Sequence, residues 1–169
     1  MKSKHLIKLV TAALMAAMTC MTTMVVPIPS PTGGFIHPGD GFVLLSGIIL
    51  GPFYGGLAAG IGSMFADIFL GYTIYAPATL IIKALAAVTG ALIYRHVRKY
   101  SVILAGIAGG IVVTSGYLLF ESMLLGNGLA AAVVGVPGNI VQNIFGIVLS
   151  SLLLPLLKKV PQIRSVMDK

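Results

Sequence analysis

The sequence predicts an all-α integral membrane protein, a single domain over residues 1–169 with six transmembrane helices. The chain is 57% hydrophobic and only 9% charged, whereas a soluble domain carries about a quarter charged residues. Its apolar stretches are separated by short segments rich in proline and glycine. Apart from Lys83, its basic residues gather at the two ends of the chain and in one connecting segment between them. Together these three observations place nearly the whole chain in a bilayer.

Six apolar segments account for the predicted helices. They cover residues 5–26, 40–50, 57–70, 77–94, 101–125 and 137–157. Pro27 ends the first helix, and Asp40 is expected to cap the second. The glycine-rich run 51–56 separates the second helix from the third, and both are short for a full span. Pro77 and Pro137 suit the first turns of the fourth and sixth helices.

The basic residues predict the orientation. They lie before the first helix, between the fourth and fifth, and after the sixth: Lys2, Lys4, Lys8, Arg95, Arg98, Lys99, Lys158, Lys159, Arg164 and Lys169. The connecting segments on the opposite side, after the first, third and fifth helices, contain no Lys or Arg. The positive-inside rule therefore puts both termini in the cytoplasm. This also explains the net charge of +7 without a nucleic-acid partner.

Asp67 and Lys83 are ionisable residues inside predicted helices. A charge at membrane depth costs at least ~2.5 kcal/mol, so it needs a partner or a function. Both lie roughly 6–9 Å below the outer surface at a rise of 1.5 Å per residue. The simplest interpretation is a structural ion pair between Asp67 and Lys83. Direct contact of Lys83 with a ligand is the alternative.

Glu121 lies at a similar depth and lacks a cation if Asp67 and Lys83 pair. It must then be protonated, face a wet cavity or meet a donor on a ligand; pairing with Lys83 is the alternative. The last helix carries a polar stripe, and amides facing lipid would leave costly unsatisfied hydrogen bonds. The stripe must therefore face protein or a cavity. It consists of Asn139, Gln142, Asn143, Gly146 and Ser150.

We expect a pocket for a small organic molecule near the outer face. The second, fourth and sixth helices all begin there, so their positive dipole ends point toward one region. Three outer loops close over it, and the long loop 28–39 is a candidate lid. The expected walls are apolar and aromatic with a few polar groups. The candidate ligand-binding residues are His37, Tyr75, Thr79, Lys83, Tyr117, Glu121, Asn139 and Asn143.

No catalytic residue, bound cofactor or metal site is expected in this chain. It contains neither the phosphate-binding G-x-x-x-x-G-K-[ST] pattern nor H-E-x-x-H, and no Cys/His cluster has metal-ligand spacing. The chain therefore cannot supply ATP hydrolysis itself. Two alternatives stay open: an intramembrane enzyme that uses Asp67 and Glu121 as acid and base, and a structural membrane subunit without a ligand.

Four segments make the chain resemble the S components of energy-coupling factor (ECF) transporters, the substrate-capture subunits of bacterial vitamin importers. These segments are HPGD at 37–40, LGPFYGG at 50–56, ADIFLGY at 66–72 and TLIIK at 79–83. The resemblance implies a cell-membrane protein of a bacterium that works with a transmembrane coupling subunit and two ABC ATPase subunits, which use ATP. It also implies docking on the coupling subunit through the small-residue face Ala12, Ala13, Ala16 and Ala17.

The resemblance is strongest to the group that handles vitamin B6 or the hydroxymethylpyrimidine precursor of thiamine. Glu121 with neutral amides suits a small nitrogen heterocycle that carries hydroxyl donors. The chain has no Trp, which departs from thiamine-binding members that stack the ligand on Trp. Riboflavin, pantothenate and a queuosine precursor remain candidates.

Overall fold

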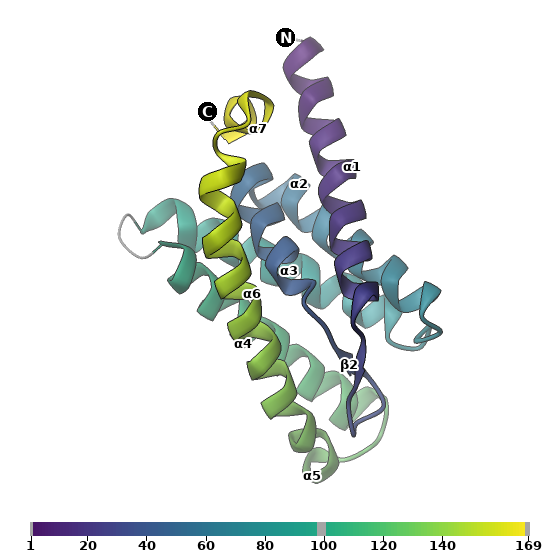
Figure 1. Cartoon of the computed structure of the whole chain (residues 1–169). Helices are drawn as coiled ribbons and strands as arrows, with labels where there is room; N and C mark the ends of the chain where they lie inside the picture. Colours follow the sequence, from purple (N-terminus) through teal and green to yellow (C-terminus); the bar gives the residue numbers. More distant parts are fainter. Residues whose placement is uncertain (1, 98–100, 168–169) are drawn as a thin grey trace.

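The computed structural model describes residues 2–97 and 101–167, which are almost entirely helical, as expected (Figure 1). A two-stranded hairpin interrupts the helices near the N-terminus, and a π-helical turn (Phe120–Leu124) and a 3-10 turn (Val133–Gly135) flank the short α5. The other elements are α1 (Lys2–Val25), β1 (Ile28–Pro29), β2 (Phe35–Ile36), α2 (Asp40–Phe69), α3 (Ala76–His96), α4 (Ser101–Leu119), α5 (Leu129–Ala132), α6 (Val136–Leu157) and α7 (Pro161–Met167).

Five helices of the described residues are long and apolar enough to cross a membrane, one fewer than expected. The difference lies in α2, which joins the two short helices predicted at 40–50 and 57–70. Only Gly51 leaves the helical conformation, with φ 81° and ψ 178°. Residues 52–56 are helical, so the expected six-residue break is wrong in extent. Pro52 follows Gly51 directly. Because a proline inside a helix removes one backbone hydrogen bond, it adds to the disruption at this point.

The two halves of α2 fold back on each other at Gly51. In a straight helix, residues nine apart are separated by roughly 13 Å along the axis. A Cβ atom at Gly55, however, would lie 2.4 Å from the backbone oxygen of Ser46. The chain therefore reverses direction, and α2 contributes two antiparallel segments to the bundle. The six predicted segments therefore still alternate in direction, although the described residues form only five helices long enough to cross a membrane.

Basic residues gather at the end of the bundle that contains this reversal, which we call the basic end. The Lys8 ammonium lies 4.5 Å from the ring centre of Tyr54. A Cβ at Gly51 would lie 2.3 Å from Nη2 of Arg95, at the end of α3. The start of α1 and α7 also lie at this end (Figure 1). This clustering agrees with the predicted topology; that the basic end faces the cytoplasm stays a prediction.

Small residues let α3 pack closely against both halves of α2. A Cβ at Gly47, in the first half, would lie 2.2 Å from the backbone oxygen of Ala87. A Cβ at Gly60, in the second half, would lie 2.6 Å from that of Leu80. This close approach places Lys83 of α3 in the centre of the bundle with none of its surface exposed.

Candidate ligand-binding site

A small cavity lies at the end of the bundle opposite the basic end. Its volume is about 30 Å³, and one water molecule needs roughly 10–15 Å³ by the same measure. The closed cavity therefore has room for about two water molecules. Twelve residues from the hairpin region, α2, α3, α4, the π-helical turn and α6 line it: Ser30, Gly34, Phe35, Ile36, His37, Asp67, Tyr75, Thr79, Tyr117, Glu121, Asn139 and Gln142.

The loop expected as a lid folds as a short β-hairpin over this cavity. β1 and β2 pair antiparallel, with Ile28 opposite Ile36. The backbone N–H of Ser30 donates to the oxygen of Gly34 at 2.8 Å, and Gly33 turns the chain with φ 93°. Glycine tolerates such a positive φ without strain. The hairpin is thus an ordered cover that contributes five of the lining residues, 30 and 34–37.

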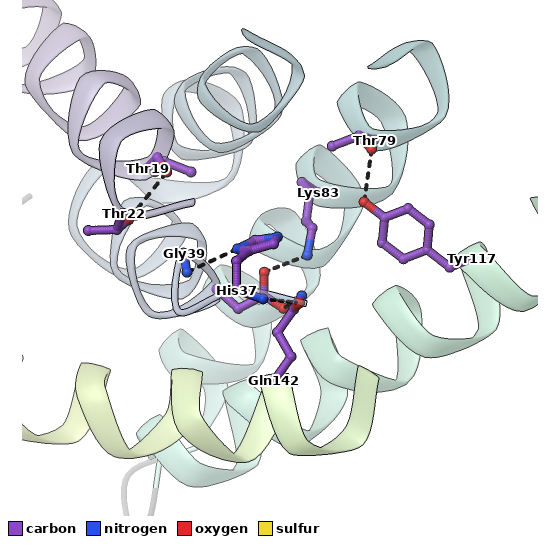
Figure 2. A network of polar contacts seen from close by, with 9 residues as sticks. Thr19, Thr22, His37, Gly39, Thr79, Lys83, Tyr117 and Gln142 are labelled. Atoms are coloured by element: carbon purple, nitrogen blue, oxygen red, sulfur yellow. Dashed lines mark hydrogen bonds and ion pairs between the residues drawn. The ribbon is translucent and has the colours of Figure 1, made fainter. Parts of the chain in front are cut away.

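Behind the cavity, a buried network joins α2, α3, α6 and the end of the hairpin. Lys83 Nζ lies 2.5 Å from Oδ1 of Asp40. The side-chain amide of Gln142 donates to Oδ2 of Asp40 at 2.8 Å, and its oxygen accepts the backbone N–H of His37 at 2.9 Å. Lys83, His37 and Gln142 converge from three elements (Figure 2). The network fixes where the hairpin meets the bundle.

Two sequence-based expectations about these residues are wrong. Lys83 pairs with Asp40, not with Asp67, so the predicted Asp67–Lys83 ion pair does not form. Asp40 is the first residue of α2 and not its cap; Gly39 occupies the cap position, with no side-chain hydrogen bond to the helix. The Asp40 carboxylate turns inward because a fully buried ammonium and a buried amide both need an acceptor.

His37 forms part of the cavity wall as a neutral imidazole. Its Nδ1 accepts the backbone N–H of Gly39 at 3.1 Å. Burial, together with the positive charge of Lys83, lowers the pKa of His37 to about 3. The proton of the neutral ring therefore resides on Nε2.

Glu121 lies on the π-helical turn, a helix irregularity that is frequent at functional sites. It is only 4% exposed. Its Oε1 accepts the hydroxyl of Thr32 at 2.9 Å, and the Tyr75 hydroxyl lies 3.5 Å away. Burial and the Glu121 carboxylate raise the pKa of Tyr75 to about 12, so this hydroxyl stays protonated. The hydrogen bond from Thr32 to Glu121 thus links the hairpin to the π-helical turn on the opposite wall of the cavity.

A second polar group lies across α2, α3 and α4. The hydroxyls of Thr79 and Tyr117 are 2.9 Å apart, and Figure 2 shows that they point toward each other. Asp67 lines the cavity beside them and is 4% exposed. Its Oδ2 is buried and has no hydrogen-bond partner.

The structure brings most of the candidate ligand-binding residues to one cavity. His37, Tyr75, Thr79, Tyr117, Glu121 and Asn139 all line it. Lys83 is not among the lining residues, because it is occupied by Asp40. Asn143 also lies elsewhere and packs onto α4: a Cβ at Gly110 would overlap its side-chain amide.

Sequence reasoning did not select Asp67, Gln142 or Thr32 for the site. Gln142 carried a usable signal, because it belongs to the polar stripe of the last helix. The sequence predicts an ion pair of Asp67 with Lys83, or an acid–base role beside Glu121 in an enzyme, and not contact with a ligand. Thr32 lies in a loop without periodicity, so nothing in the sequence marked it.

The small-residue face of α1 divides into two parts. Ala12 and Ala16 are half-buried and pack against the core. A Cβ at Gly62 of α2 would lie 2.3 Å from the backbone oxygen of Ala16. Ala13 and Ala17 are exposed. Only the second pair is therefore free to contact another protein without rearranging the bundle.

Comparisons with known proteins agree with the fold and with the sequence resemblance. A family model described as the ECF-type riboflavin transporter S component matches residues 3–159. A protein of Pyrococcus woesei described as an uncharacterized protein in a gap 3′ region is 38% identical over 141 residues, which cover 82% of this chain and 93% of that protein. A solved structure of the S component of a bacterial ECF transporter superposes with a TM-score of 0.69 at 21% identity, covering 90% of this chain and 95% of the other. The match over nearly the whole length shows that this chain belongs to the ECF-type riboflavin transporter S component family.

Proposed function

We propose that this protein captures a small heterocyclic vitamin or vitamin precursor in the cavity beneath the hairpin. The observation that carries the proposal is the convergence of polar groups from the hairpin region and five helical elements on one small cavity. The walls combine aromatic rings with a few hydrogen-bonding groups, as in small-molecule sites. A buried cavity of this kind argues against a purely structural subunit.

Binding requires the hairpin to move. A cavity of about 30 Å³ is far smaller than a vitamin ring system, since ligand pockets enclose about 300–1,000 Å³. The hairpin meets the opposite wall through Thr32 and Glu121. If contacts with a ligand replaced the hydrogen bond between Thr32 and Glu121, the hairpin would move away from the opposite wall. The ligand would then occupy the space beneath it.

The preferred ligands are a pyridoxine-type vitamin or hydroxymethylpyrimidine. Both are small rings with hydroxyl or amino donors that match the acceptors Glu121 and Asn139 in the cavity wall. Riboflavin is a third candidate because the family takes its name from riboflavin transport. We assign no role in turnover, because the family consists of transporter subunits and not of enzymes.

Delivery across the membrane is proposed to depend on partners. S components of this family work with a transmembrane coupling subunit and ABC ATPases, and this chain has no phosphate-binding motif of its own. We place the multi-pass protein in the plasma membrane of a bacterium, with the cavity facing outward. ATP hydrolysis in the partner module would drive release of the ligand to the cytoplasm.

Mass spectrometry of the protein purified in detergent from cells tests the ligand assignment. A single vitamin or precursor should be retained at about one per chain, and calorimetry with that compound should give the same stoichiometry. The proposal is overturned if no such compound is retained and if pyridoxine, hydroxymethylpyrimidine and riboflavin all fail to bind the ligand-free protein.

A further inference from the structure

Asp67 is a buried carboxylate that the protein itself leaves half satisfied. It is 4% exposed, it lines the cavity, and its Oδ2 has no hydrogen-bond partner. Burying a charged oxygen without a partner is costly. Because Asp67 lies in the cavity wall, its carboxyl group is within reach of a ligand that enlarges the cavity.

Within residues 2–97 and 101–167, no ion pair with Asp67 is present. Lys83, the cation that acts electrostatically on Asp67, is paired with Asp40. His37 is neutral and its Nδ1 is already an acceptor for Gly39. None of the twelve lining residues is Lys or Arg, whereas two of them, Asp67 and Glu121, are carboxylic acids.

The neighbouring hydroxyl groups of Thr79 and Tyr117 do not provide a hydrogen-bond donor for Oδ2 of Asp67 either. Thr79 has a single hydroxyl proton, and its hydroxyl is in hydrogen-bond contact with that of Tyr117. If Thr79 donates to Asp67, Tyr117 must donate to Thr79, and both protons are then used. Oδ2 of Asp67 therefore remains a buried acceptor without a partner, on a residue of the cavity wall. A ligand that enlarges the cavity could place a donor there.

We propose that Asp67 is a ligand-binding residue whose free oxygen accepts an N–H or O–H group of the ligand, and that the cavity selects neutral or protonated heterocycles and rejects anions. The inference rests on the proposed function and narrows its substrate class. When they are ionised, two carboxylates with no Lys or Arg among the lining residues repel a phosphate or carboxylate on the ligand. A ring nitrogen that carries hydrogen, an amino group or a hydroxyl is attracted to them.

Matched pairs of compounds test the charge selection. Pyridoxine with its 5′-phosphate, and riboflavin with its phosphate ester, differ only in the anionic group. Calorimetry with hydroxymethylpyrimidine and both pairs should identify at least one uncharged compound that binds, with its phosphate ester at least tenfold weaker. If a phosphate ester binds as tightly as its parent, the charge selection is wrong.

Substitution of Asp67 tests the residue assignment with a readout that a structural role would not produce. Asp67→Asn should weaken binding of the identified compound by about 10–100-fold, because one charge-assisted hydrogen bond is lost. The ligand-free Asp67→Asn protein should melt at the same temperature as the wild type or higher, since an unpartnered carboxylate is removed. Asp40→Asn is the matched control: the same change breaks the Lys83 pair and should lower the melting temperature.

The outcomes separate this inference from the proposed function. If the wild type binds a compound and Asp67→Asn binds it equally well, Asp67 is not a ligand-binding residue and the proposed function stands. If Asp67→Asn melts well below the wild type without ligand, Asp67 is structural and the inference is wrong. If the wild type binds none of the compounds, the proposed function itself fails.

Discussion

At the scale of single residues, Asp40 connects the helices behind the cavity, because its two carboxylate oxygens accept hydrogen bonds from two buried donors on different helices. Lys83 contributes the charge, and Gln142 extends the network to the hairpin. The buried Lys83–Asp40 ion pair need not increase the net stability of the fold, because the cost of removing both charges from water offsets their attraction. Loss of one partner is nevertheless severe, at about 3–5 kcal/mol, since an unpaired buried charge remains. The network therefore determines where the hairpin sits.

His37 predicts how stability depends on pH. Its folded-state pKa of about 3 lies below the ordinary value of 6.5. Between these values the unfolded chain binds a proton that the folded protein excludes, so stability falls as the pH drops below 6.5. The slope from this residue approaches about 1.4 kcal/mol per pH unit. Thermal unfolding in detergent from pH 7 to pH 5 measures it.

The variant His37→Gln provides the control for this measurement. A glutamine does not titrate, so the variant should lose less stability on acidification than the wild type. The difference between the two slopes isolates His37 from other acid-sensitive groups. Parallel curves for the two proteins would show that His37 is not buried as a neutral ring.

At the scale of elements, the reversal inside α2 sets the architecture. Gly51 supplies the positive φ, and Gly55 allows the second half to touch the first at Ser46. The reversal lets both halves pack on α3, which places Lys83 opposite Asp40. The π-helical turn plays a comparable part on the other wall, since it carries Glu121 toward the hairpin.

Gly55→Ala should destabilise the protein strongly. The added Cβ would meet the backbone of the first half of α2 at 2.4 Å, and backbone cannot swing aside as a side chain can. We expect a loss of about 3 kcal/mol in the free energy of unfolding. Gly126→Ala is the matched control: it has a positive φ of 71° but no atom within 4 Å of the new Cβ. That change should cost only about 1–2 kcal/mol, and equal losses would argue against the tight reversal.

At the scale of the whole molecule, the proposed ligand cavity and the proposed partner-docking face lie in different parts of the structure. The cavity occupies the end opposite the basic residues, whereas the exposed small residues lie along α1. We therefore propose that ligand capture and partner docking use separate surfaces. Substitutions on α1 can then be used to separate the two activities.

Ala13→Leu combined with Ala17→Leu should block transport without weakening ligand binding. Both alanines are exposed, and bulky side chains would prevent close helix contact with a coupling subunit. We expect at least a tenfold loss of uptake in cells, with an unchanged dissociation constant for the purified protein. Val148→Phe, on the exposed face of α6, is a control for added bulk facing lipid. Normal uptake by the alanine variant would refute docking through this face.

The sequence by itself determined that the chain lies in a membrane, where most of its helices begin and end, and that its basic residues gather on alternate connections. These properties depend on local composition: apolar length, proline and glycine positions, and the cost of placing charge in lipid. Membership in the S component family was also accessible, because four short segments carried it and the family comparison confirmed it.

Only the tertiary structure decided which polar groups meet. Local pattern requires an acceptor for Lys83 but does not choose between Asp40 and Asp67. It marks a polar stripe on α6 but does not tell that Gln142 faces the cavity while Asn143 packs on Gly110. That choice depends on the rotation of each helix and on the reversal at Gly51. Both result from the packing of many small residues at once, which no single segment encodes.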